Sequence, residues 1–166
     1  MIKVVSFNID DKLMDKVSFE ERFYFEEIPK LISVHHKVSL DKAKAVAIRD
    51  YKTISITDPN FYRPQIWFDK FKIKPDWKDI VEDMVHHIQI HREVPESIQK
   101  LHKRYQIIFV TKHQKDFLRA KLKACGLQGD YNTIFSTVDD LNIAKKDQRI
   151  YEQIPKILRV QPDEII

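Results

Sequence analysis

Apolar residues gather in several short runs along the chain, the first of them close to the N-terminus. Between residues 2 and 9 the run contains Ile2, Val4, Val5, Phe7 and Ile9. Such a run, rich in β-branched residues, predicts a buried strand. The stretches 106–111 and 133–137 have the same character and predict a second and a third strand, and 163–166 predicts the start of a fourth.

Between these strands the apolar positions recur every three or four residues, which predicts helices. The first helix follows Ser18 and runs past Pro29, which is expected to kink or end it. The second is capped by Ser39 or Asp41. Further helices are predicted at about residues 75–88, 95–105, 116–124 and 145–158, the last with an interruption at Pro155. The stretch 53–57 fits a short strand or, equally, a helix end and a loop. Alternating strands and helices predict an α/β fold, a doubly wound parallel sheet.

The first strand ends abruptly in polar residues, Asn8, Asp10, Asp11 and Lys12. In open α/β sheets ligands bind at the carboxyl ends of the strands. A small acidic cluster there offers oxygen ligands for a divalent cation. The alternative is a solvated turn.

Two other stretches invite a functional interpretation. Residues 61–71 are dense in aromatic side chains, which favours a helix in the core over the wall of a substrate pocket. His86, His87 and His91 are assigned to the helix that starts near residue 75 and runs through Ile88, and His87 and His91 are spaced to share a helical face. Because no cysteine or acidic residue stands at ligand spacing, a solvated polar face is favoured over a zinc site.

Composition narrows the classes of protein. A chain of 166 residues with 43% hydrophobic residues suits one domain, or one domain with a modest insertion. The 29 basic residues are balanced by 25 acidic ones, which argues against a nucleic-acid-binding surface. No apolar run approaches the roughly 18 residues of a membrane span. A single cysteine, Cys125, favours a reducing, cytoplasmic setting.

Residues 7–15, FNIDDKLMD, resemble the first motif of the haloacid dehalogenase-like (HAD-like) superfamily, F-D-x-D-G-T-L-x-D. In that family the first aspartate is the nucleophile that accepts the phosphoryl group and binds magnesium, and here it is Asn8. The second, a general acid/base, is Asp10. The resemblance therefore implies a magnesium site at Asn8 and Asp10, and Asp11 and Lys12 replace the family's Gly and Thr.

The second half of the chain is similar to the later motifs. Thr111 ends a predicted strand, as in the second motif, where its hydroxyl and the N–H of Lys112 would hold a phosphate oxygen. The third motif implies a catalytic lysine at Lys145, or at Lys146 if the register slips by one. Residues 161–166 resemble what precedes the fourth motif, whose acidic pair is missing. The resemblance implies a HAD-like, Rossmann-type core over 1–14 and 93–166 and a helical cap over 15–92.

Three functions follow from this resemblance. The first is a phosphatase-type protein whose activity is lost or very low, because an amide is a poor nucleophile. The second is an active phosphatase or dehalogenase-like hydrolase in which Asp11 takes over as acceptor. The third is a non-catalytic module that binds an anion or a partner, through the aromatic stretch around Trp67. The expected ligand is a small phosphorylated metabolite or another anion, with no nucleic acid and no membrane.

Overall fold

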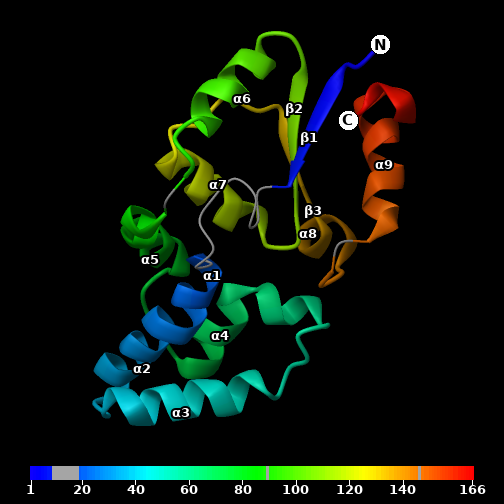
Figure 1. The fold of residues 1–166 in the computed structure, drawn as a ribbon. Coiled ribbons are helices and arrows are strands. Elements are labelled where there is room, and N and C mark those ends of the chain that lie inside the picture. The colour runs from blue at the N-terminus through cyan, green and yellow to red at the C-terminus, as the bar shows by residue number, and fades with distance from the viewer. Residues whose placement is uncertain (9–18, 89, 146) are drawn as a thin grey trace.

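A computed structural model describes residues 1–8, 19–88, 90–145 and 147–166 (Figure 1). Its sheet consists of β1 (Val4–Asn8), β2 (Gln106–Thr111) and β3 (Thr133–Ser136). The strands are parallel and lie in the order β1-β2-β3, with Asn8 opposite Val110 and Thr111 opposite Ser136. The three strands predicted from the apolar runs are thereby confirmed.

Of the predicted start of a fourth strand at 163–166, only the last two residues pair beside β1, because Asp163 and Glu164 belong to the 3-10 helix η4 (Pro162–Glu164). Ile165 forms a parallel bridge with Val4. The N–H of Ser6 donates to the carbonyl of Ile166 at 2.7 Å, and the N–H of Ile166 donates to the carbonyl of Val4 at 3.1 Å. Since β2 pairs with the other edge of β1, the chain end extends the sheet on the side away from β2.

Helices cover both faces of the sheet, as a doubly wound fold requires. Alternate residues of β2 point to opposite faces. Ile107 and Phe109 pack in one cluster, with α6 (Val94–His102) and α7 (Lys115–Ala124), whereas Ile108 and Val110 pack in another, with α9 (Gln148–Leu158). Figure 1 shows α9 on one side of the strands and α6 and α7 on the other.

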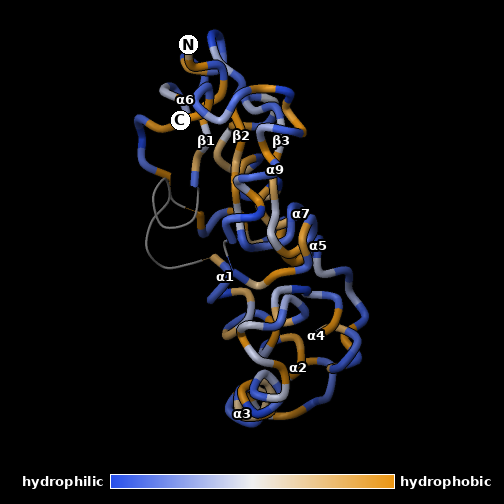
Figure 2. Tube along the Cα trace, turned by 90° about the vertical axis from the view of Figure 1, so that its right-hand side faces the viewer, coloured by the Kyte–Doolittle hydropathy of each residue, from blue (hydrophilic) through white to orange (hydrophobic). Residues whose placement is uncertain are grey.

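A second group of helices, the helical layer, lies beyond the carboxyl ends of the strands and packs around its own aromatic cluster. Its members are α1 (Phe19–Arg22), the π-helical η1 (Phe23–Glu27), α2 (Ile28–His36), α3 (Leu40–Tyr51), the 3-10 helix η2 (Pro59–Tyr62), α4 (Pro64–Phe71), α5 (Trp77–Asp83) and the 3-10 helix η3 (Met84–His87). Figure 2 shows α2, α3 and α4 at the far end of an elongated molecule. No helix in the described ranges combines the length and the apolar character that crossing a membrane requires. The proposed division at residues 14/15 and 92/93 stays a prediction, and the first of these boundaries falls outside the described residues.

The aromatic stretch 61–71 belongs to the core, as the spacing favoured. Trp67 is completely buried and Phe68 and Phe71 nearly so. The indole N–H of Trp67 donates to the carbonyl of Phe61 at 2.8 Å, so its one polar atom is satisfied. These three rings are therefore part of the core, and the partner interaction proposed for this stretch stays a prediction.

Both prolines that were expected to break helices are accommodated instead. Before Pro29 the helix widens into the π-helical η1, where the N–H of Ile28 donates to the carbonyl of Phe23. Pro29 then lies in the first turn of α2, and the helix continues to His36. Pro155 lies buried inside α9, which runs on to Leu158. Pro155 has no N–H and therefore removes one helical hydrogen bond, while its ring is buried.

The structure decides three local predictions. Ser39, rather than Asp41, caps α3, since its side chain accepts the N–H of Lys42. Residues 53–57 form a loop. The helix that begins at Trp77 ends at Asp83 and gives way to η3, so His87 and His91 do not share a helical face; that prediction was wrong, although these histidines are exposed as the solvated reading required.

Candidate functional site at the carboxyl edge of the sheet

Three polar residues end the three strands at one edge of the sheet: Asn8, Thr111 and Ser136. Asn8 is exposed, whereas Thr111 and Ser136 are completely buried. The Thr111 hydroxyl accepts the N–H of His113 at 3.1 Å, and the Ser136 hydroxyl donates to the carbonyl of His113 at 2.7 Å. The backbone just after β2 is therefore held from two neighbouring strand ends.

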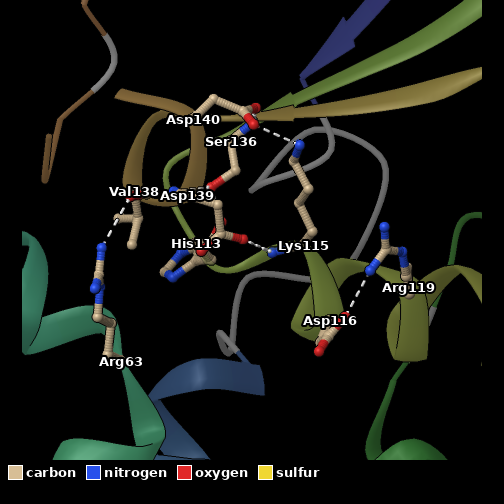
Figure 3. Close-up of polar contacts among 9 residues, drawn as sticks. All are labelled: Arg63, His113, Lys115, Asp116, Arg119, Ser136, Val138, Asp139 and Asp140. Atoms are coloured by element: carbon tan, nitrogen blue, oxygen red, sulfur yellow. Dashed lines mark hydrogen bonds and ion pairs between the residues drawn. The ribbon is translucent and has the colours of Figure 1, made fainter. Parts of the chain in front are cut away.

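Two carboxylates at the start of α8 (Thr137–Leu141), a helix absent from the sequence prediction, close this edge (Figure 3). Asp140 accepts the N–H of Ser136 at 2.8 Å and pairs with the ammonium of Lys115 at 2.6 Å. Asp139 accepts the N–H of Lys115 at 2.8 Å. Both carboxylates thus fasten the start of α7 to the start of α8.

The helical layer contributes a buried ion pair to the same edge. Glu20 of α1 lies 2.7 Å from the ammonium of Lys121 on α7, and its carboxylate is 3.9 Å from Nε2 of His113. All three side chains are buried. Burial opposes ionisation of Glu20, but the charges of Lys121 and His113 outweigh it and lower the pKa of Glu20 to about 2.

A second contact from the helical layer involves η2 and the start of α4. The rings of Tyr62 and His113 meet edge to face with centroids 5.5 Å apart, and the ammonium of Lys112 lies 5.8 Å from the Tyr62 ring. Next to Tyr62, Arg63 donates from Nη2 to Oδ1 of Asn142 at 2.9 Å and to the carbonyl of Val138 at 3.4 Å. Figure 3 shows the Arg63 side chain reaching from the helical layer to α8.

The predicted site residues are only partly brought together. Asn8, Thr111 and Lys112 share the carboxyl edge. Lys145 is exposed between α8 and α9, and no contact within the described residues joins it to that edge; its charge adds to the hydrogen bonds of Arg149 that lower the pKa of Asp147 to about 2. Asp10, Asp11, Lys12 and Lys146 lie outside the described residues.

A magnesium ion prefers several oxygen ligands in octahedral geometry. Asn8 offers one neutral amide oxygen. The carboxylates of Asp139 and Asp140 already accept the backbone N–H groups of Lys115 and Ser136. In the described part of the chain no group of three or more His, Cys, Asp or Glu residues could hold a metal ion. The described residues by themselves therefore do not fit a magnesium site.

Sequence reasoning missed the residues that join the two layers: Glu20, Arg63, His113 and Lys121. Glu20 and Lys121 are 101 positions apart, and neither has an unusual neighbour in the sequence. The available signal was a charged residue on an apolar helical face, since Lys121 sits between Leu118 and Leu122, both buried. That signal does not identify the partner.

The arrangement defines the class of protein: a doubly wound α/β domain with polar strand ends facing an added helical layer. The family model for haloacid dehalogenase-like hydrolases matches residues 26–166. The chain belongs to this family, which confirms the predicted family and the predicted fold class.

Solved structures support the fold. The chain is similar to a HAD phosphatase from Thermococcus onnurineus, with 21% identity, a TM-score of 0.72, and coverage of 99% of this chain and 75% of that chain. It is also similar to L-2-haloacid dehalogenase from Xanthobacter autotrophicus, with 15% identity, a TM-score of 0.54, and coverage of 99% and 68%. A HAD-superfamily hydrolase of subfamily IA from Geobacter sulfurreducens PCA shows 11% identity, a TM-score of 0.56, and coverage of 99% and 78%. No curated protein sequence matches the chain.

Proposed function

We propose that this chain is a phosphatase-type member of the family that binds small phosphorylated metabolites and whose hydrolytic activity is lost or very low. The observation that carries the proposal is Asn8, exposed at the end of β1 on the same edge as Thr111 and Lys112. In the family the residue at this position accepts the phosphoryl group. The similarity of the fold to a HAD phosphatase, with a TM-score of 0.72, supports phosphate as the ligand class.

The reason for lost turnover is chemical. A carboxylate at position 8 would attack phosphorus, release the alcohol and form an acyl phosphate that water then hydrolyses. The Asn8 amide carries no negative charge and its nitrogen lone pair is delocalised into the carbonyl group, so this first bond does not form. Lys112 still supplies positive charge beside the strand ends, which suits retention of an anion. Magnesium would depend on Asp10 in addition to Asn8, and its affinity is expected to be weak.

The proposal predicts that Asn8→Asp restores phosphate release. With an aryl phosphate and magnesium, we expect slow release by the natural chain and a rate higher by at least ~10²-fold in Asn8→Asp, because a covalent nucleophile contributes several powers of ten. Gln153→Glu, which exchanges an amide for a carboxylate on the exposed surface of α9, is the matched control and is expected to stay slow.

Fast release by the natural chain would contradict the proposal. If Asp11→Ala then abolished that release, Asp11 would be the acceptor instead. Failure of both the natural chain and Asn8→Asp to turn over, with inorganic phosphate still bound, would leave an anion-binding protein without the means of hydrolysis.

A further inference from the structure

The cations where the helical layer meets the sheet edge fall into two groups. Lys115 pairs with Asp140 at 2.6 Å, Lys121 with Glu20 at 2.7 Å, and Arg119 with Asp116 at 2.6 Å. Arg63 and Lys112 have no carboxylate partner within 4.0 Å among the residues that the structure describes. They flank the contact between Tyr62 and His113, one from the helical layer and one from the sheet. This part of the site therefore carries uncompensated positive charge.

Arg63 is also poorly satisfied as a hydrogen-bond donor. Its two acceptors, Asn142 and Val138, are neutral and both bind Nη2. Among the described residues, the buried Nε of Arg63 has no hydrogen-bond partner. A guanidinium normally places this fork of N–H groups on a carboxylate or phosphate.

Other buried polar atoms without partners lie next to residues that contact Tyr62 or Arg63. Oε1 of Gln114 is one residue beyond His113, and Oγ1 of Thr137 is one residue before Val138. Native structures seldom leave such atoms unpaired, and a bound ligand is one way of pairing them. Three of the four such atoms among the described residues thus belong to segments that contact one another through Tyr62 and His113 and through Arg63 and Val138; the fourth is Nδ1 of His102.

We propose that Arg63 is a substrate-binding residue that recognises a carboxylate on the phosphorylated ligand. This proposal rests on the proposed function, in which the phosphoryl group lies near Lys112. A carboxylate fits because its single charge and two oxygens match the single charge and the N–H fork of one guanidinium. The ligand class is accordingly a small phosphorylated carboxylic acid.

The test is calorimetric titration of the full chain with two ligands of similar size, 2-phosphoglycolate and ethyl phosphate, of which only the first has a carboxylate. We expect the natural chain to bind 2-phosphoglycolate at least ~10-fold more tightly, the usual worth of a charge-assisted bidentate contact. Arg63→Met should lose this preference and retain its affinity for ethyl phosphate. Arg119→Met, which removes a guanidinium already paired with Asp116, is the matched control and should keep the preference.

Arg63→Lys keeps the charge without the fork and is expected to keep only part of the preference, which secures the test if the methionine variant does not fold. If Arg63 merely fastens the helical layer to α8, its replacement lowers the affinity for both ligands equally, and the proposal is wrong. Equal binding of both ligands by the natural chain overturns this proposal alone. Binding of neither ligand overturns the proposed function along with it.

Discussion

Glu20 shows what a single buried charge requires in this molecule. A carboxylate removed from water is costly unless a counter-charge and hydrogen bonds replace its hydration. Lys121 supplies both at 2.7 Å, and the imidazole of His113 lies nearby. Because Lys121 is itself buried, each member of the pair depends on the other.

The lowered pKa of Glu20 predicts acid sensitivity. Its pKa falls from 4.5 to about 2 on folding, so the stabilisation is present above pH 4.5 and is lost as the pH falls towards 2. By linkage the full effect is roughly 3 kcal/mol. Urea unfolding of the natural chain and of Glu20→Gln at pH 5 and pH 3 measures it: the free energy of unfolding should drop more steeply in the natural chain.

Glu20→Gln should also be less stable than the natural chain at neutral pH, by about 3–5 kcal/mol, because Lys121 is left buried and charged. Glu96→Gln is the control, since Glu96 pairs with Lys100 on the exposed surface of α6 and little stability depends on such a pair. An identical pH slope in the natural chain and in Glu20→Gln would show that the carboxylate does not carry the effect.

At the scale of elements, the strands were predictable and the short helices were not. Continuous apolar runs such as 106–111 are typical of a strand that is buried on both faces of a parallel sheet. Sequence and structure therefore agree at β2. Helix α8 has five residues and is held by Asp139 and Asp140 bonding to α7 and to Ser136. The contacts to Lys115 come from 24 and 25 positions away, so they leave no periodicity in the sequence around α8.

Gly126 directly follows Cys125, the C-cap residue of α7. The glycine has φ of +70°, and the N–H of Leu127 bonds back to the carbonyl of Leu122 at 2.9 Å. A side chain at Gly126 would meet open space, so only the backbone conformation opposes it. We expect Gly126→Ala to lower the free energy of unfolding by about 1–2 kcal/mol.

Gly126→Asn tests the reason for that loss. Asparagine tolerates the left-handed conformation better than alanine does, so its cost should be clearly smaller. Urea unfolding of the two variants side by side gives the comparison. Equal losses would mean that the left-handed backbone conformation is not the cause.

At the scale of the whole molecule, α7 joins the two layers through opposite faces. Phe117 enters the aromatic cluster of the helical layer, with its ring centroid 5.0 Å from that of Phe23 and 5.5 Å from that of Trp77. Leu118 and Leu122 pack against the sheet. One helix therefore transmits packing from the sheet to the helical layer.

Phe117→Ala should loosen the helical layer selectively. Removal of a completely buried ring typically costs 3–5 kcal/mol. In hydrogen exchange we expect amides of α1 to α4 to lose protection while those of β2 keep more of theirs. Leu122→Ala is the matched variant on the other face of α7, and the reverse pattern is expected. The same loss of protection throughout both layers in both variants would show that they unfold as one unit.

The candidate site was predictable only as far as the strand ends. Asn8, Thr111 and Lys112 follow apolar runs directly, so their position at one edge follows from the parallel topology. Lys145 was assigned from a motif that lacks both of the family's prolines here, and the structure leaves it exposed. Arg63 and Glu20 reach the edge only because the helical layer packs against α7 and α8, which is a tertiary property.

The aromatic cluster has an optical consequence. The two tryptophans of the chain, Trp67 and Trp77, both lie in the helical layer and are both buried. The Trp77 ring stacks on Phe117, with an interplanar angle of 14°, and the ammonium of Lys78 lies 5.7 Å from it. Intrinsic tryptophan fluorescence of this protein therefore reports on the helical layer and on its contact with α7, and not on the sheet. An emission shift on adding a ligand would signal a change in the surroundings of that layer.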